Sequence, residues 1–76
     1  MNAIQCKMAR TALKLGVRDL ATLANVSQDT VSRFERGETL KSETVSLIQN
    51  TLENHGAIFI AENGEGPGVR LKKSLK

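Results

Sequence analysis

The stretch that decides the fold spans residues 17–36 and reads VRDLATLANVSQDTVSRFER. Its apolar residues recur every three or four positions, which is the period of a helix, on both sides of a break at Asn25-Val26-Ser27. Asn25 is a residue type that tolerates the left-handed conformation at a helix end, and Ser27 is a strong N-cap for a second helix. The small Ala21 allows the two helices to approach closely where they cross. The stretch therefore predicts a helix-turn-helix.

The outer face of the second of these helices, residues 28–36, is polar. Side chains on it have the lengths that read base edges, because Gln can bind adenine, Arg can bind guanine and Asp can accept from cytosine. Ser27 also leaves the first amides of this helix free for a phosphate. Such a face is either a DNA-recognition surface or a solvated surface in a fold that has lost DNA binding, and we favour the first. The residues concerned are Gln28, Asp29, Thr30, Ser32 and Arg33.

Helices are also predicted on both sides of this motif. Apolar residues at helical spacing predict one helix over residues 2–15, ended by Gly16, and another over residues 42–55, ended by Gly56. On the first of them we expect Cys6 and Met8 in the core, Cys6 as a small buried hydrophobe rather than a redox switch.

The composition changes after Gly56. Residues 57–61 form a β-prone run, residues 69–72 alternate apolar with basic side chains, and residues 62–68 between them are rich in Gly, Pro and Asn. We therefore expect a mainly α fold: a four-helix helix-turn-helix DNA-binding domain at residues 1–56, then a C-terminal β-hairpin with a basic tail at residues 57–76.

Net charge alone does not indicate DNA binding by the body of this chain. The 11 Lys and Arg exceed the 8 Asp and Glu by three, but four of the cations follow Pro67, which leaves seven against eight before it. The tail either lies along phosphates or is a solvated end. Its cations are Arg70, Lys72, Lys73 and Lys76.

The sequence argues against several classes of protein. Cys6 is the only cysteine and His55 the only histidine, so we expect no intrachain disulfide, no metal site and no cofactor. No nucleophile motif, phosphate-binding loop or pair of catalytic carboxylates is present, so we do not expect an enzyme. Lys7 and Arg10 interrupt the apolar residues near the start, and no apolar run is long enough to span a bilayer. We expect a cytoplasmic protein without a membrane partner, associated with the nucleoid through DNA.

The segments 17–21, 24–27 and 30–37, which read VRDLA, ANVS and TVSRFERG, resemble the XRE/Cro/C1-like family of bacterial and phage DNA-binding regulators. The resemblance implies base contacts from Gln28, Asp29 and Arg33, and positions near the groove wall for Thr30 and Ser32. The sequence departs from the family at Gly16, where a Ser or Thr cap is preferred, and at Val17, where a phosphate-contacting Gln is common. Together these considerations give the expected DNA-binding residues Val17, Arg18, Ser27, Gln28, Asp29, Thr30, Ser32, Arg33 and Arg36.

The same resemblance implies an ion pair between Arg10 and Glu35 that locks the first helix to the third. Such a pair would be structural, so we do not count Arg10 or Glu35 among the DNA-binding residues.

The predicted hairpin is apolar on both faces, because Ile58 and Ile60 alternate with Phe59 along its first strand. One helix layer cannot cover both faces. Either the tail folds over the second face, or two copies of the chain meet there, and we favour a homodimer because two recognition helices on a palindromic operator require one. The expected dimerisation residues are Ile58, Phe59, Ile60, Val69 and Leu71.

The sequence as a whole predicts a sequence-specific transcriptional regulator, acting as a repressor, with residues 28–36 as recognition helix in double-stranded DNA. The alternative is a protein-binding module, an antiactivator or an antitoxin, that holds a protein partner through the C-terminal hairpin. The operator sequence, any effector and the choice between repression and activation do not follow from the sequence.

Overall fold

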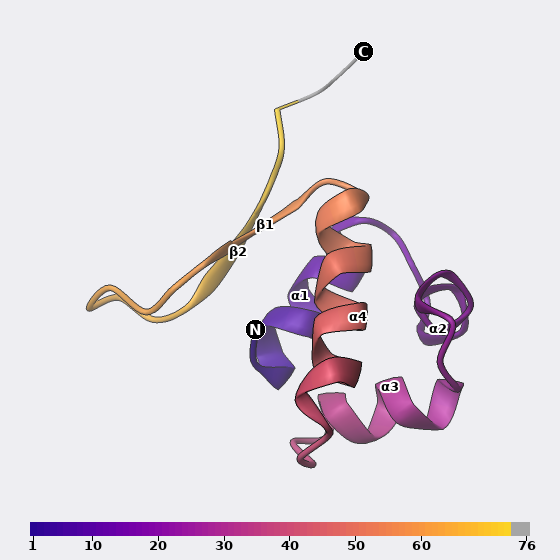
Figure 1. The fold of residues 1–76 in the computed structure, drawn as a ribbon. Coiled ribbons are helices and arrows are strands. Elements are labelled where there is room, and N and C mark those ends of the chain that lie inside the picture. The colour runs from indigo at the N-terminus through magenta and orange to yellow at the C-terminus, as the bar shows by residue number, and fades with distance from the viewer. Residues whose placement is uncertain (74–76) are drawn as a thin grey trace.

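Four helices and one antiparallel hairpin make up the computed structural model, which describes residues 1–73 (Figure 1). The expected fold class is therefore confirmed, and Lys76 of the basic tail lies outside the described residues. The elements are α1 (Ala3–Ala12), α2 (Val17–Ala24), α3 (Gln28–Glu35), α4 (Ser42–Asn54), β1 (Ala57–Ile60) and β2 (Gly68–Leu71).

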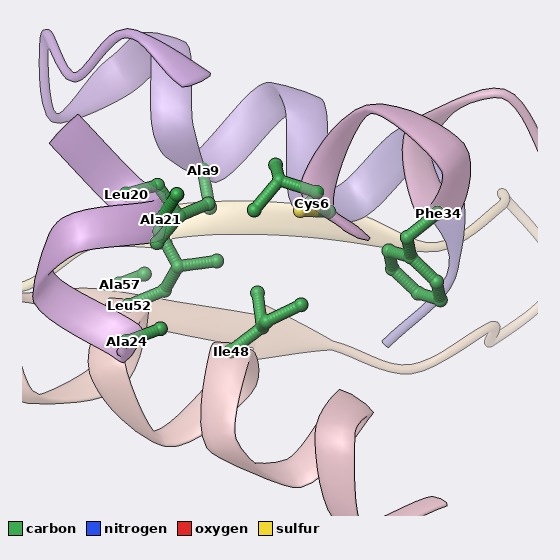
Figure 2. Close-up of a cluster of buried hydrophobic side chains, with 10 residues drawn as sticks. Cys6, Ala9, Leu20, Ala21, Ala24, Phe34, Ile48, Leu52 and Ala57 are labelled. Atoms are coloured by element: carbon green, nitrogen blue, oxygen red, sulfur yellow. The ribbon is translucent and has the colours of Figure 1, made fainter. Parts of the chain in front are cut away.

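The core lies where the four helices and β1 meet (Figure 2). Leu20, Val31, Ile48 and Leu52 are its largest fully buried apolar side chains, and Cys6 is fully buried beside them, as expected. Alanines occupy several of the remaining core positions, so neighbouring elements approach closely, and Phe34 is the one aromatic side chain of the buried cluster. The alanines are Ala9, Ala21, Ala24 and Ala57.

The end of α1 differs from the prediction. The helix stops at Ala12, and Lys14, not Gly16, adopts the left-handed conformation, with φ 62°. The amide of Leu15 donates to Arg10 O (2.9 Å) and that of Lys14 to Thr11 O (3.0 Å), the two bonds of a Schellman motif. Leu15 lies beyond the helix but still matches its apolar spacing. This motif turns the half-buried side chain of Leu15 back toward the core. Gly16 instead has φ −80° and is the N-cap of α2.

The expectation that Met8 belongs to the core is wrong. Met8 is 37% exposed and Ile4 62% exposed, whereas Cys6 and Ala9 are fully buried. Apolar residues extend around more of α1 than its neighbours cover, because α3, α4 and β2 pack against one side of the helix. Ile4, Met8 and Ala12 therefore line a shallow apolar hollow on the surface.

The hairpin lies across α1 and α4 with one face inward. Phe59 pairs with Val69, and both pack against the helical core. Ile58 pairs with Arg70 on the opposite face and remains 37% exposed. The side-chain amide of buried Gln5 donates to Ile60 O (3.0 Å) and Gly68 O (3.1 Å), which ties both strands to α1. No helix among the residues described here is long and apolar enough to cross a membrane.

Candidate nucleic-acid interface

The turn between α2 and α3 has the geometry that the sequence predicted. Asn25 closes α2 in the left-handed conformation, with φ 60°, and Val26 N donates to Ala21 O (2.9 Å). Ser27 caps α3, because its Oγ accepts from Thr30 N at 3.0 Å. Val31 and Phe34 anchor the inner side of α3 in the core. The orientation of α3 is therefore fixed at its start and along its length.

The outer side of α3 brings most of the predicted DNA-binding residues together. Gln28, Asp29 and Arg36 are exposed, and Thr30, Ser32 and Arg33 are half-buried along the same side. Arg33 Nε lies 2.9 Å from Asp29 Oδ2 and has no hydrogen-bond partner within residues 1–73, so this contact is an ion pair without a directed hydrogen bond. Spacing of four residues on one helix places the two side chains side by side.

The two residues predicted at the start of α2 differ in exposure. Arg18 is exposed, but the side chain of Val17 packs against the core, where an aliphatic side chain is more stable than on the surface. Asp19 Oδ2 accepts from Gly16 N at 2.8 Å. Only Arg18 and the backbone amides of this first turn are left to meet a phosphate.

Arg10 and Glu35 form a bidentate ion pair between α1 and α3. Arg10 Nε and Nη2 each donate to a different oxygen of Glu35 at 2.9 Å, and Arg10 Nη1 donates to Leu15 O at 3.1 Å. The side chains are only 14% and 8% exposed. The hydrogen bonds that Arg10 donates to Glu35 raise the pKa of Arg10 further above its ordinary value. Glu35 is thus occupied inside the fold rather than turned toward a ligand.

Cys6 lies beside this pair, with its thiol donating to Glu35 Oε2 at 3.4 Å. Burial, reinforced by the neighbouring Glu35 charge, raises the pKa of the Cys6 thiol to about 12. A protonated, inaccessible thiol is a poor nucleophile, which agrees with a packing role. Among the described residues, no group of three His, Cys, Asp or Glu could hold a metal ion.

A shallow groove beside α3 includes residues that sequence reasoning missed. It runs from the start of α3 to the first turn of α4, and Lys41 stands exposed at its edge as the N-cap of α4. The loop before α4 has no periodic pattern to mark it, although a lysine directly before a helix start could have indicated anion binding. The newly found lining residues are Thr39, Leu40, Lys41 and Thr44.

The tail lies far from this surface. Figure 1 shows the end of the described chain at the top of the molecule and α3 at the bottom. Arg70, Lys72 and Lys73 are exposed, and Lys72 N donates to Gly56 O just beyond the C-terminal end of α4, whereas α3 leads into the N-terminal end of that helix. Within one copy of the chain, these cations do not lie beside the groove or the outer side of α3.

The residues expected at a dimer interface divide between two faces of the hairpin. Phe59 and Val69 pack against the core of their own chain, because the inward face of the sheet covers α1 and α4. Ile58 (37% exposed) and half-buried Ile60 face outward, and Leu71 is 43% exposed at the edge of the inward face. The uncovered apolar surface is thus smaller than the five predicted residues suggested.

Comparison with known proteins agrees with this geometry. A family model described as helix-turn-helix matches residues 7–56, which is more than half of the chain and includes α2, the turn, α3 and α4. No curated protein matches the chain at a significant level. The chain belongs to the XRE/Cro/C1-like helix-turn-helix family of DNA-binding transcription regulators.

Proposed function

We propose that this protein is a sequence-specific transcriptional repressor that binds a palindromic operator in the cytoplasm as a homodimer. The observation that carries the proposal is the outer side of α3, a row of hydrogen-bonding side chains on a helix whose cap, buried residues and ion pair to α1 hold it in one orientation. A rigid helix presenting such side chains is suited to base readout in the major groove.

Each part of this surface has a distinct role in the proposal. Gln28, Asp29 and Arg33 contact base edges, while Thr30 and Ser32 lie near the groove wall. The backbone is held by phosphate contacts from Arg18, Ser27 and Arg36, from the first amides of α2 at Val17, and from Lys41 across the groove. These contacts fix the register and leave the choice of sequence to the bases.

Repression requires nothing more than occupancy of a promoter. A domain that covers an operator excludes polymerase by its own volume, whereas activation requires a further contact to polymerase.

We assign DNA binding to residues 1–56 and dimerisation to residues 57–76, through the outward face formed by Ile58 and Ile60 and the edge at Leu71.

A second candidate function is supported by the apolar hollow on α1. Ile4 and Met8 are exposed there at helical spacing, and no residue of the hairpin lines the hollow. An antiactivator or antitoxin that holds a protein partner would use such a surface, alone or together with DNA binding.

Selection of binding sites from random duplex DNA by the full chain separates the two candidates. The repressor proposal expects enrichment of a palindrome whose half-sites are centred about one helical turn apart. Failure to enrich any sequence, together with co-purification of a stoichiometric protein partner, would favour the second candidate.

A further inference from the structure

We propose that Glu38 is a specificity-determining residue that competes with DNA for the two arginines of the recognition helix. The inference rests on the proposed function, in which Arg33 contacts a base and Arg36 a phosphate. In the free protein, Glu38 and Asp29 hold these arginines within the chain, so that tight binding depends on the base that Arg33 meets.

The backbone places Glu38 where it can reach both arginines. Gly37 has φ 96°, and no atom outside its chain neighbours lies within 4 Å of the position of an added Cβ, so the left-handed conformation alone explains the glycine. Gly37 N donates to Phe34 O (2.9 Å) and Glu38 N to Arg33 O (3.0 Å), which are the two bonds of a Schellman motif. Glu38 is thus folded back over the last turn of α3.

The contacts form a compact and electrically neutral cluster. Glu38 Oε2 lies 3.5 Å from Arg36 Nη2, and Glu38 Oε1 lies 4.0 Å from Arg33 Nη1. Asp29 Oδ2 lies 2.9 Å from Arg33 Nε on the other side. Two carboxylates therefore face two guanidinium groups, so the end of α3 offers no net positive charge to a passing duplex.

The cluster is exposed, which makes it exchangeable rather than structural. The side chains are 40% exposed at Arg33, 60% at Arg36 and 50% at Glu38. Ion pairs with this much solvent contact are weak and easily replaced. The buried pair of Arg10 with Glu35 has no such freedom.

The free energy gained when DNA replaces the carboxylates at Arg33 and Arg36 differs between DNA sequences. A phosphate only substitutes one anion for another at Arg33 or Arg36, so non-specific binding gains little from breaking the cluster. Guanine offers two acceptors, O6 and N7, to a single guanidinium. Arg33 now faces Glu38 only across 4.0 Å, so the correct base provides hydrogen bonds that the cluster lacks. Glu38 thereby suppresses binding to wrong sequences more than binding to the operator.

The experiment compares Glu38→Gln with the wild type on the selected operator and on random duplex DNA. Gln keeps the size of the side chain and the backbone bond to Arg33 but removes the charge. We expect affinity for random DNA to rise about three- to ten-fold and operator affinity to rise less, so that the ratio falls. On random DNA the slope of log K against log salt should steepen by about one for each arginine released.

Two further variants separate the cluster from a general charge effect. Glu43→Gln removes the same charge from an exposed residue in the first turn of α4, which makes no ion pair within residues 1–73, and should shift both affinities equally. Glu38→Asp keeps the charge but shortens the reach, and should move the ratio in the same direction as Glu38→Gln. In a background of Arg33→Ala and Arg36→Ala, Glu38→Gln should no longer differ from Glu43→Gln.

Two results would overturn the proposal: an identical effect of Glu38→Gln and Glu43→Gln, or a full effect of Glu38→Gln without the two arginines. A wild-type protein that prefers no sequence would instead contradict the proposed function. Thermal melting of each variant checks that the folded fraction is the same.

Discussion

At the residue scale, two ion pairs of α3, Arg10 with Glu35 and Arg33 with Asp29, differ in burial, and burial decides what each can do. Arg10 and Glu35 are 14% and 8% exposed, so removing either partner leaves a desolvated charge without compensation. Arg33 and Asp29 are 40% and 71% exposed, so water or DNA can replace either partner at little cost. The first pair therefore fixes the helix, and the second leaves Arg33 available for the base contact that we propose.

Arg33→Ala should weaken binding to the selected operator by about 1–3 kcal/mol and relax the preference at one base position, because a guanidinium is lost from the base edge. Fluorescence anisotropy on the operator and on its single-base variants measures both effects. Arg18→Ala serves as the matched control, since its exposed side chain at the start of α2 is assigned to phosphate. An equal loss on operator and random DNA for Arg33→Ala would contradict base reading.

Cys6 gives a prediction about pH. Its pKa is raised from the ordinary 9.0 to about 12, chiefly by burial, so above pH 9 the unfolded chain releases a proton that the folded chain keeps. The stabilisation is therefore complete below pH 9 and is lost as the pH rises toward 12. Between about pH 8 and about pH 10.5 the free energy of unfolding should fall by about 2 kcal/mol more in the wild type than in Cys6→Ala. Urea denaturation of both proteins measures this, and parallel pH profiles would refute it.

At the element scale, helix positions could be predicted from the sequence better than helix ends and surface exposure. The i, i+3 and i, i+4 spacing of apolar residues is a property of the sequence itself, and it was enough to predict the positions of α2, the turn and α3. The end of α1 at Ala12, followed by a left-handed Lys14, was not predictable in the same way, because Leu15 continues the period and lysine rarely adopts a positive φ. The exposure of Met8 depends on how much of the surface of α1 is covered by neighbouring elements, and the spacing of apolar residues carries no information about that.

The candidate site shows the same division. The cap at Ser27 and the outer side of α3 follow from local spacing. The ion pair of Asp29 with Arg33 could also have been predicted, because the two residues are four positions apart on one helix. The contact of Glu38 with α3 depends on a left-handed Gly37, and the groove with Lys41 depends on how the loop before α4 folds back. Such contacts arise from tertiary geometry and have no periodic signal.

Gln5 connects α1 to the hairpin, and the sequence did not predict this structural role. Its side-chain amide donates to one carbonyl on each strand, and its Oε1 accepts from Asn2 N at 2.9 Å. Gln5→Leu should destabilise the fold by about 1–3 kcal/mol, because buried backbone groups lose their partners. Hydrogen exchange should show the loss first in β1 and β2. Gln49→Leu is the control, since its amide bonds to Glu53 rather than to the hairpin, and equal strand protection in both variants would count against this role.

At the scale of the whole molecule, α3 and the hairpin present separate surfaces. The groove beside α3 is bordered by the first turn of α4, whereas Lys72 N donates to Gly56 O beyond the last turn of α4, and Figure 1 shows α3 below the hairpin. The proposed DNA-binding and dimerisation surfaces therefore share no residues. This separation suits a dimer in which each protomer presents one recognition helix.

Ile58→Glu tests that arrangement, because Ile58 is 37% exposed on the outward face of β1, opposite the face that packs on the helices. In an isologous interface each substitution acts twice and places like charges near the two-fold axis. The variant should remain folded, sediment as a monomer near 8.3 kDa, and bind the operator at least about ten-fold more weakly, because half-site binding is no longer coupled.

Ile4→Glu is the matched control for Ile58→Glu, since Ile4 is 62% exposed in the apolar hollow on α1. Analytical ultracentrifugation at micromolar concentration should show it as a dimer, like the wild type. Dissociation by Ile4→Glu with Ile58→Glu unaffected would move the interface to α1, and a monomeric wild type would remove the dimer altogether. In that last case a palindromic operator would have to be filled by two independent monomers, and occupancy would rise with protein concentration without cooperativity between the half-sites.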